Sequence, residues 1–296
     1  MKPMTANTSA PTGPVQVREF SVTGTEKDIV RTRKSPFYLL VYNDPNARRL
    51  FIIVALMALW QAYALWLDNP FLFPTLNATI GAFFSESLNG ILVVRSLISL
   101  KVLLSGYLLG ILVAAILTLL ATSSKIGVSF LETLAAMLSP LPSIALLPLA
   151  MLWFGLGNPS LVFVLIHAVA WVVAMNTFSG FQSVSPTLRM VGHNYGLGWL
   201  AYVWRIFIPA AFPNILAGLK IGWAFAWRTL IAAELIFGAS SGQGGLGWYI
   251  FQNKNSLEVE NVFAGLLSVI LIGLFVDIFI FKQIERLTVQ RWGMQN

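Results

Sequence analysis

The chain contains no cysteine and little charge. Its 296 residues include 0 cysteines and 2 histidines, which excludes a disulfide framework, a thiolate metal site and a cysteine nucleophile and leaves few ligands for zinc. Charged residues make up 10% of the chain and apolar residues 57%. An ordinary soluble domain has about 25% charged residues. This composition excludes a water-soluble globular domain and predicts an all-α, polytopic protein whose apolar side chains face a lipid bilayer.

Nucleotide-binding motifs are missing as well. The pattern G-x-x-x-x-G-K-[ST] does not occur, so the chain has no P-loop with which to hydrolyse a nucleotide. Gly242, Gly244 and Gly247 match G-x-G-x-x-G, but no strand is predicted before them, so we discard dinucleotide binding. The net charge of +7 lies mostly between hydrophobic runs, which argues against a nucleic-acid partner. We therefore expect no catalytic site, no metal and no cofactor in this chain.

Long apolar runs take the place of these motifs. A helix of about 20 residues rises about 30 Å, enough to cross the hydrocarbon of a bilayer. Six such runs lie near residues 50–67, 101–121, 128–154, 159–180, 215–237 and 260–281. Most of the 19 lysines and arginines fall on one side of these runs; Arg95, Lys101 and Lys254 fall on the other, and Arg228 lies within a run. By the positive-inside rule, the sequence predicts six transmembrane helices with both termini in the cytoplasm.

Residues 1–47 differ from the rest of the chain. They are polar, rich in Thr, Pro, Lys and Arg, and show no sustained apolar period. Such a segment cannot bury enough apolar surface to fold by itself. We expect a largely disordered cytoplasmic extension over 1–47 and a membrane domain over 48–296.

Small residues and prolines inside the runs predict how the helices pack. Residues 106–110 and 218–222 each read Gly-x-x-x-Gly, which lets helix backbones approach closely. Pro140, Pro142 and Pro148 interrupt the third run. Backbone without its helical donors is tolerated at membrane depth only inside protein or beside a water-filled cavity. The third run is therefore either a kinked packing helix or a segment that lines a pathway.

The connection between the fourth and fifth runs is long but does not resemble a linker. Between Pro186 and Pro209, apolar residues recur at spacings of three and four, and Gly192, Gly196 and Gly198 interrupt them. This pattern predicts two short amphipathic helices bent at glycines. Their apolar faces suit either the membrane surface or a groove on a soluble partner.

The spacing within this connection resembles a known motif. Gly196, nine further residues and then Ile206-Phe207-Ile208-Pro209 resemble the EAA loop, E-A-A-x3-G-x9-I-x-L-P, of permease subunits of bacterial ABC importers. Residues 139–157, 209–222 and 232–235 resemble the nitrate/sulfonate/taurine branch of that family. The sequence departs from the motif at 190–192, where Met-Val-Gly stands in place of Glu-Ala-Ala.

The resemblance implies a fold, a mechanism and partners. It implies the type I ABC importer permease fold in the bacterial inner membrane, with two copies of the permease, two ABC ATPase subunits that bind ATP and Mg, and a periplasmic substrate-binding protein. Closure of the ATPases would pull on the EAA-like loop at 186–209 and drive alternating access. The implied coupling residues are Gly192, His193, Asn194, Tyr195, Gly196, Leu197, Gly198 and Pro209.

The resemblance also implies a small anionic solute, such as nitrate, a sulfonate, taurine or an aromatic carboxylate, moved from periplasm to cytoplasm. An ATP-independent secondary transporter or channel for a small solute is the alternative. Such a protein would act alone and would need no docking loop.

Arg228 is the main candidate for the pathway. A guanidinium near the middle of a span is costly unless it faces water, a counter-ion or substrate. His167 lies at the same expected depth, about 13 Å from the outer surface. Arg228 with Trp223 and Trp227 would offer a cation and aromatic rings to an anion; alternatively, Arg228 bonds to carbonyls freed by the prolines. The expected pathway residues are Pro140, Pro142, His167, Trp223, Trp227, Arg228 and Glu234.

Overall fold

The computed structural model describes residues 44–237 and 244–291, and these ranges are almost entirely helical. The chain divides after Val54 into two compact units, and the account below concerns the second, Ala55–Asn296, with helix α2 (Pro45–Leu67) taken by itself. The extension predicted over 1–47 lies outside the described residues, except that residues 45–47 begin α2. Gly242 of the glycine-rich motif lies outside them as well.

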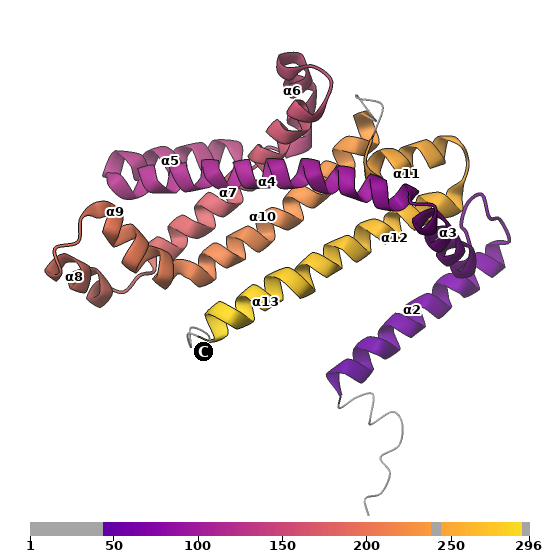
Figure 1. Ribbon diagram of the computed structural model, residues 1–296, viewed down its shortest axis with the longest axis horizontal. Helices are drawn as coiled ribbons and strands as arrows, with labels where there is room; N and C mark the ends of the chain where they lie inside the picture. The colour runs from indigo at the N-terminus through magenta and orange to yellow at the C-terminus, as the bar shows by residue number, and fades with distance from the viewer. Residues whose placement is uncertain (1–43, 238–243, 292–296) are drawn as a thin grey trace, which may run out of the picture. The chain divides into compact units, whose positions relative to one another are not determined.

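Helices follow one another with short connections (Figure 1). After α2 the order is α3 (Leu76–Leu88), α4 (Ile91–Ser123), α5 (Lys125–Leu138), η1 (Ser143–Leu146), α6 (Leu147–Phe154), α7 (Asn158–Gln182), α8 (Pro186–Asn194), α9 (Trp199–Tyr202), η2 (Val203–Phe207), α10 (Ile208–Phe237), α11 (Leu246–Asn255), α12 (Val259–Phe275), η3 (Val276–Phe281), α13 (Lys282–Glu285) and η4 (Arg286–Gln290). Two long helices contain π-helical stretches and form the continuous apolar runs Trp199–Ile236 and Val259–Val289.

Five of the described helical runs are long and apolar enough to cross a membrane. The predicted third span, 128–154, is not one helix: α5 and the η1–α6 segment meet at an angle of 87°. The bend falls at Pro140 and Pro142, because proline lacks an N–H donor and disfavours helical conformation in the residue before it. The prediction of six spans is met when this bent pair counts as one span.

Two short helices were not predicted, and α4 is longer than predicted. Helix α3 begins after Thr75, whose hydroxyl accepts a hydrogen bond from the Ala78 N–H at 3.2 Å. Helix α11 begins at Leu246, directly after Gly245. Helix α4 begins at Ile91, well before the predicted start at 101. Arg95 therefore lies within the helix rather than before it.

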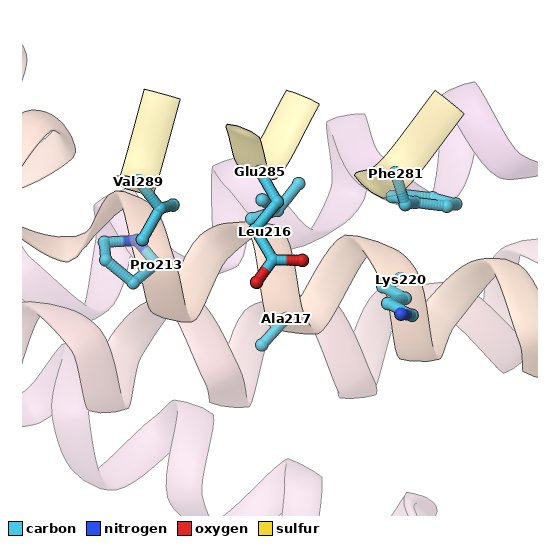
Figure 2. A pocket seen from close by; sticks show the side chains of 7 residues that line it. All are labelled: Pro213, Leu216, Ala217, Lys220, Phe281, Glu285 and Val289. Carbon is cyan, nitrogen blue, oxygen red and sulfur yellow. The ribbon is translucent and has the colours of Figure 1, made fainter. Parts of the chain in front are cut away.

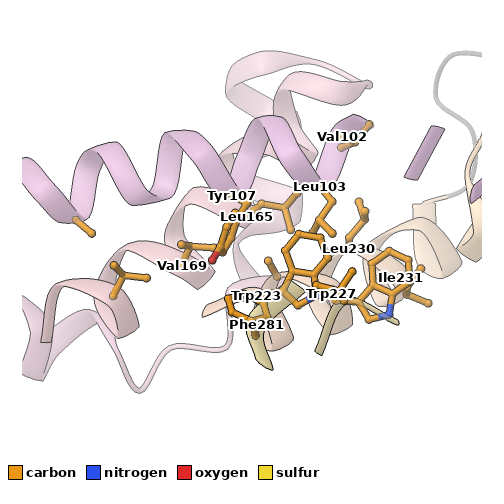
Figure 3. Packing of buried hydrophobic residues seen from close by; sticks show 14 of the residues in the cluster. Val102, Leu103, Tyr107, Leu165, Val169, Trp223, Trp227, Leu230, Ile231 and Phe281 are labelled. Carbon is orange, nitrogen blue, oxygen red and sulfur yellow. The ribbon is translucent and has the colours of Figure 1, made fainter. Parts of the chain in front are cut away.

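Helix α7 packs between α4 and α10 and holds the core together (Figure 3). A Cβ at Gly106 would lie 2.5 Å from the Leu165 Cβ, and a Cβ at Gly222 would lie 3.0 Å from Val173 Cγ2. Glycine at these positions therefore permits the close packing that the two Gly-x-x-x-Gly pairs predicted, and that prediction is confirmed.

Candidate functional site

One face of α10 carries two cations and is exposed along its length. Residues on the opposite face, such as Ala226 and Leu230, have 0% exposure. A charged side chain at membrane depth is stable only where it meets water, a counter-ion or a substrate. We call the exposed face the α10 stripe, and it consists of Ala217, Lys220, Ile221, Ala224, Phe225 and Arg228.

Arg228 lies on the α10 stripe and makes few protein contacts. Its Nε–H donates to the Ala224 carbonyl at 3.1 Å, and its guanidinium carbon lies 4.8 Å from the centre of the Phe225 ring. No carboxylate among the described residues lies within ion-pair distance of it. The guanidinium thus bonds to a carbonyl of its own helix, and the expected bonds to carbonyls freed by the prolines are not present in the described structure. The Arg228 side chain is exposed.

Trp223 and Trp227 do not share a surface with Arg228, contrary to expectation. They are 8% and 6% exposed. Trp223 packs edge-on against Tyr107 with ring centres 5.4 Å apart, and the Trp227 Nε1–H donates to the Val269 carbonyl at 3.2 Å (Figure 3). Consecutive helical residues differ by about 100° in direction, so the two tryptophans face the core while Arg228 faces away.

Lys220, the second cation of the stripe, is paired. Its Nζ lies 2.8 Å from Asp277 Oδ1, and both side chains are about half exposed, at 48% and 49%. A cavity of about 310 Å³ lies between α10 and the last helical run, as Figure 2 shows. Neither Lys220 nor Asp277 is among the pathway residues that the sequence predicted. The cavity is lined by Pro213, Leu216, Ala217, Lys220, Phe281, Glu285 and Val289.

His167 of α7 lies beside the bend between α5 and α6 and contacts it through a side-chain hydrogen bond. Ser143 Oγ, directly after Pro142, lies 3.0 Å from His167 Nδ1. The structure therefore brings His167 to the proline segment. His167 Nε2 and Trp171 Nε1 are buried and have no hydrogen-bonding partner among the described residues. The two rings lie 6.3 Å apart on consecutive turns of α7.

Glu234 is buried at the start of α11. It is 3% exposed, and its carboxylate accepts hydrogen bonds from Ser99 Oγ at 2.9 Å and from the Gly247 N–H at 2.8 Å. Ser99 Oγ in turn accepts from the Leu246 N–H at 2.8 Å. The free N–H groups and the positive end of a helix dipole favour a carboxylate at this position. We call this arrangement of Ser99, Glu234, Leu246 and Gly247 the Glu234 clamp.

The turn before α11 fits closely against the Glu234 clamp. The Arg95 guanidinium donates to the Gly244 carbonyl at 2.7 Å, which ties the turn to α4. A Cβ at Gly245 would overlap Ser99 Oγ and the Glu234 carboxylate. Glycine is therefore required at position 245, because a side chain would not fit there.

The connection at 186–209 contains the two short helices that its pattern predicted. Gly192 in α8 faces Tyr202 and Ile206, and a Cβ there would lie 2.5 Å from Ile206 Cδ1. Gly196 has φ +65°, in the left-handed region that favours glycine. The second helix differs from expectation because α9 runs without a break through η2 into α10. The π-helical turn precedes Pro209, whose missing N–H cannot bond within a regular α-helix.

The other predicted coupling residues surround this turn. His193 and Asn194 end α8, the Leu197 N–H donates to the Gly192 carbonyl at 3.3 Å, and Gly198 is the N-cap residue of α9. Around the turn, large apolar side chains stay exposed. We call them the loop surface: Leu188, Met190, Val191, Tyr195, Trp199 and Leu200.

Arg189 fixes this loop to α7 and was missed in the sequence. Its guanidinium donates to the carbonyls of Phe181 at 3.0 Å and Val184 at 3.1 Å. The Phe181 carbonyl belongs to the last turn of α7, where carbonyls lack helical partners, and Val184 follows the helix end. A basic residue shortly after a predicted helix end was the available signal.

Comparisons with known proteins agree with this arrangement. Residues 106–288 match the family described as binding-protein-dependent transport system inner membrane component. The chain is similar to a Methanocaldococcus jannaschii protein that bears the name of an ABC transporter permease, 32% identical over 240 residues that cover 78% of this chain and 89% of that protein. It is similar to the nitrate import permease protein of Synechocystis, 29% identical over 260 residues that cover 84% and 92% of the two chains. A Bacillus subtilis protein named as an aliphatic sulfonates transport permease is 30% identical over 238 residues, covering 80% and 84%.

A solved structure shares the fold. The crystal structure of an amino acid ABC transporter with histidines aligns with a TM-score of 0.51, covering 71% of this chain and 98% of that chain. Its sequence is 19% identical, so the likeness concerns the fold alone.

Proposed function

The chain belongs to the family of binding-protein-dependent transport system inner membrane components, and we propose that it is the permease subunit of an ATP-driven importer for a small anionic solute. Relatives named for nitrate and for aliphatic sulfonates support a solute that bears an oxyanion. In this proposal the solute crosses the bacterial inner membrane from periplasm to cytoplasm by alternating access, and both termini lie in the cytoplasm. ATP and Mg bind to separate ATPase subunits.

The strongest support for the proposed pathway is the exposed α10 stripe. Lys220 and Arg228 lie about 12 Å apart along the helix axis, and both are on the exposed side. Lys220 has Asp277 as its counter-ion, but lipid cannot accommodate at low cost the guanidinium of Arg228, which is unpaired among the described residues. The stripe therefore suits a water-filled path between two copies of the chain, along which an anion meets positive charge. In this arrangement Trp223 and Trp227 pack α10 against the core on its buried side, and Glu234 anchors the C-terminal end of α10 through the Glu234 clamp.

The loop surface supports docking of an ATPase subunit. Tyr195 is 79% exposed although it lies on a turn whose backbone is fixed by Gly192 and Gly196. A rigid turn with exposed aromatic and aliphatic side chains suits insertion into a groove on a soluble partner. We assign Gly192, His193, Asn194, Tyr195, Gly196, Leu197, Gly198 and Pro209 to this coupling element.

Co-expression with the cognate ATPase and binding protein tests the proposal. We expect a complex of two permease and two ATPase subunits, and uptake of labelled nitrate or taurine into proteoliposomes that requires both ATP and the binding protein. Uptake at full rate without the ATPase would overturn the importer assignment and favour a channel or secondary transporter. Transport of a neutral solute alone would overturn the anionic solute but leave the importer assignment intact.

A further inference from the structure

We propose that Ser143, His167 and Trp171 form a binding station for an oxyanion at the bend between α5 and α6. The inference rests on the proposed function, because it assumes that the transported solute is an anion. It adds Trp171, whose N–H binds an oxygen, and Ser143, whose hydroxyl positions the His167 ring; neither was among the expected pathway residues.

Several buried polar atoms lack partners among the described residues. Among the described residues, the buried side-chain atoms without a hydrogen-bonding partner are Thr79 Oγ1, His167 Nε2, Trp171 Nε1 and Trp223 Nε1. Native proteins rarely leave such groups unpaired, and each instance asks for an explanation such as a water or an ion. Two of these atoms belong to residues one turn apart on α7.

The chemistry of the two atoms selects the class of ligand. An indole Nε1–H can only donate. When the Ser143 hydroxyl donates to His167 Nδ1, at 3.0 Å, the neutral imidazole carries its proton on Nε2 and offers a second donor. Two N–H groups suit oxygen atoms that bear negative charge, whereas a metal cation would need oxygen ligands. The class of ligand is therefore an oxyanion: a nitrate, a sulfonate or a carboxylate.

The position of the station fits a route through the protein. Ser143 begins η1 directly after the bend, and its hydroxyl holds the His167 ring. A change in the 87° bend would therefore change how the His167 donor is presented. Met175 continues the same face of α7 and is 36% exposed. A solute released from the station would meet this exposed face next.

The experiment removes one donor at a time from the complete complex. The complex with ATPase and binding protein is reconstituted, and uptake of labelled nitrate, taurine and phthalate is measured over a range of concentrations. Trp171→Phe keeps the ring and deletes the N–H. We expect it to lower the maximal uptake rate of the transported anion about tenfold, as for one hydrogen bond to a charged group, with the melting temperature and the affinity of the isolated binding protein unchanged.

Two other tryptophans provide matched controls. Trp223→Phe deletes an equally unpaired N–H in the core beside Tyr107, and Trp227→Phe deletes an N–H that already bonds to Val269. We expect near-normal uptake in the first and a lower melting temperature in the second. If Trp171→Phe transports as well as Trp223→Phe, the unpaired N–H meets only water and the station is overturned.

Ser143 offers a second test that spares the large side chain. Ser143→Ala should lower uptake of the same anion, and Ser143→Thr, which restores the hydroxyl, should recover it. If Trp171→Phe proves unstable, the comparison of Ser143→Ala with Ser143→Thr tests the binding station instead. Equal uptake in these two variants would overturn the station. Failure of the proposed function looks different: the unmodified complex would then transport none of the three anions.

Discussion

Two polar sites lie among the apolar helices, and they differ in how completely their groups are paired. In the Glu234 clamp, the carboxylate, the Ser99 hydroxyl and the N–H groups that face them are all hydrogen-bonded. At the bend, His167 Nε2 and Trp171 Nε1 have no partner among the described residues. A fully satisfied polar network fixes a structure, whereas unpaired donors have a high free energy until something binds them. The first site therefore suits a structural joint and the second suits a changing occupant.

Helix α10 connects this contrast to the rest of the molecule. Glu234 on its buried side closes one end, while Arg228 lies on the exposed side. The two residues are six positions apart, about 240° around the helix, so they cannot pair with each other. One helix thus carries a structural carboxylate and an available cation on different faces.

Breaking the clamp should have the largest effect. Glu234→Leu removes the acceptor from Ser99 and from the Gly247 N–H and leaves both buried and unpaired. We expect a loss of stability on the order of 2–4 kcal/mol, seen as low yield and a lower melting temperature of the detergent-purified protein. Glu234→Gln, which keeps an acceptor, should lose less. A Glu234→Leu variant that melts normally but fails to transport would instead place Glu234 in the pathway.

The spans were predictable because their signal is local and strong. Long apolar runs fix helix positions from composition alone, and the prolines marked the bend between α5 and α6. The angle of 87° was not predictable, because it depends on packing against α7. Helices α3 and α11 were missed because they are short and lack a long apolar run.

The candidate sites were predictable only where one residue type was unusual for its position. Arg228 stood out as a charge within a span. Ser99 did not, since it acquires its role from Glu234, 135 residues away in the chain. The direction of Trp223 and Trp227 was available in principle from helical geometry, but which side of α10 faces the core depends on its neighbours.

The coupling turn offers the next largest effect, on energy transfer rather than on folding. Gly196→Val forces a β-branched residue to adopt φ +65°, at a cost of about 1–2 kcal/mol for the left-handed region. We expect insertion to survive and solute-stimulated ATP hydrolysis to fall roughly tenfold. Gly198→Ala is the matched control, because Gly198 has φ −62° and open space around it. Equal stimulation in both variants would remove the turn from the coupling element.

Deleting the charge of the exposed stripe should have a more moderate effect. Arg228→Met keeps an unbranched side chain and removes only one hydrogen bond, to the Ala224 carbonyl. We expect anion uptake to fall about three- to tenfold with an unchanged melting temperature. Arg228→Lys should retain most of the uptake, since the charge remains. Normal uptake in Arg228→Met would exclude this guanidinium from the pathway and leave the bend as the only proposed contact with the anion.

The smallest expected effect tests whether the clamp holds α11 alone. The Tyr249 hydroxyl, one turn beyond the clamp, donates to the Glu86 carboxylate at 3.2 Å. Burial and then the Glu86 carboxylate raise the pKa of Tyr249 above its ordinary value of 10.0, so the folded protein keeps the phenolic proton more tightly than the unfolded chain. That contribution to stability is complete below about pH 10 and is lost as pH rises further.

We therefore expect Tyr249→Phe to lower stability by about 1 kcal/mol at neutral pH, because the hydrogen bond to Glu86 is lost. Its melting temperature should also fall less steeply above pH 10 than that of the unmodified protein, since the titrating group is gone. Combining Tyr249→Phe with Glu234→Gln measures the coupling between the two contacts. Additive losses mean that each contact holds α11 independently. A combined loss clearly smaller than the sum means that breaking either contact already loosens the other, so that the paired network acts as one joint, which is the behaviour that the unpaired donors at the bend should lack.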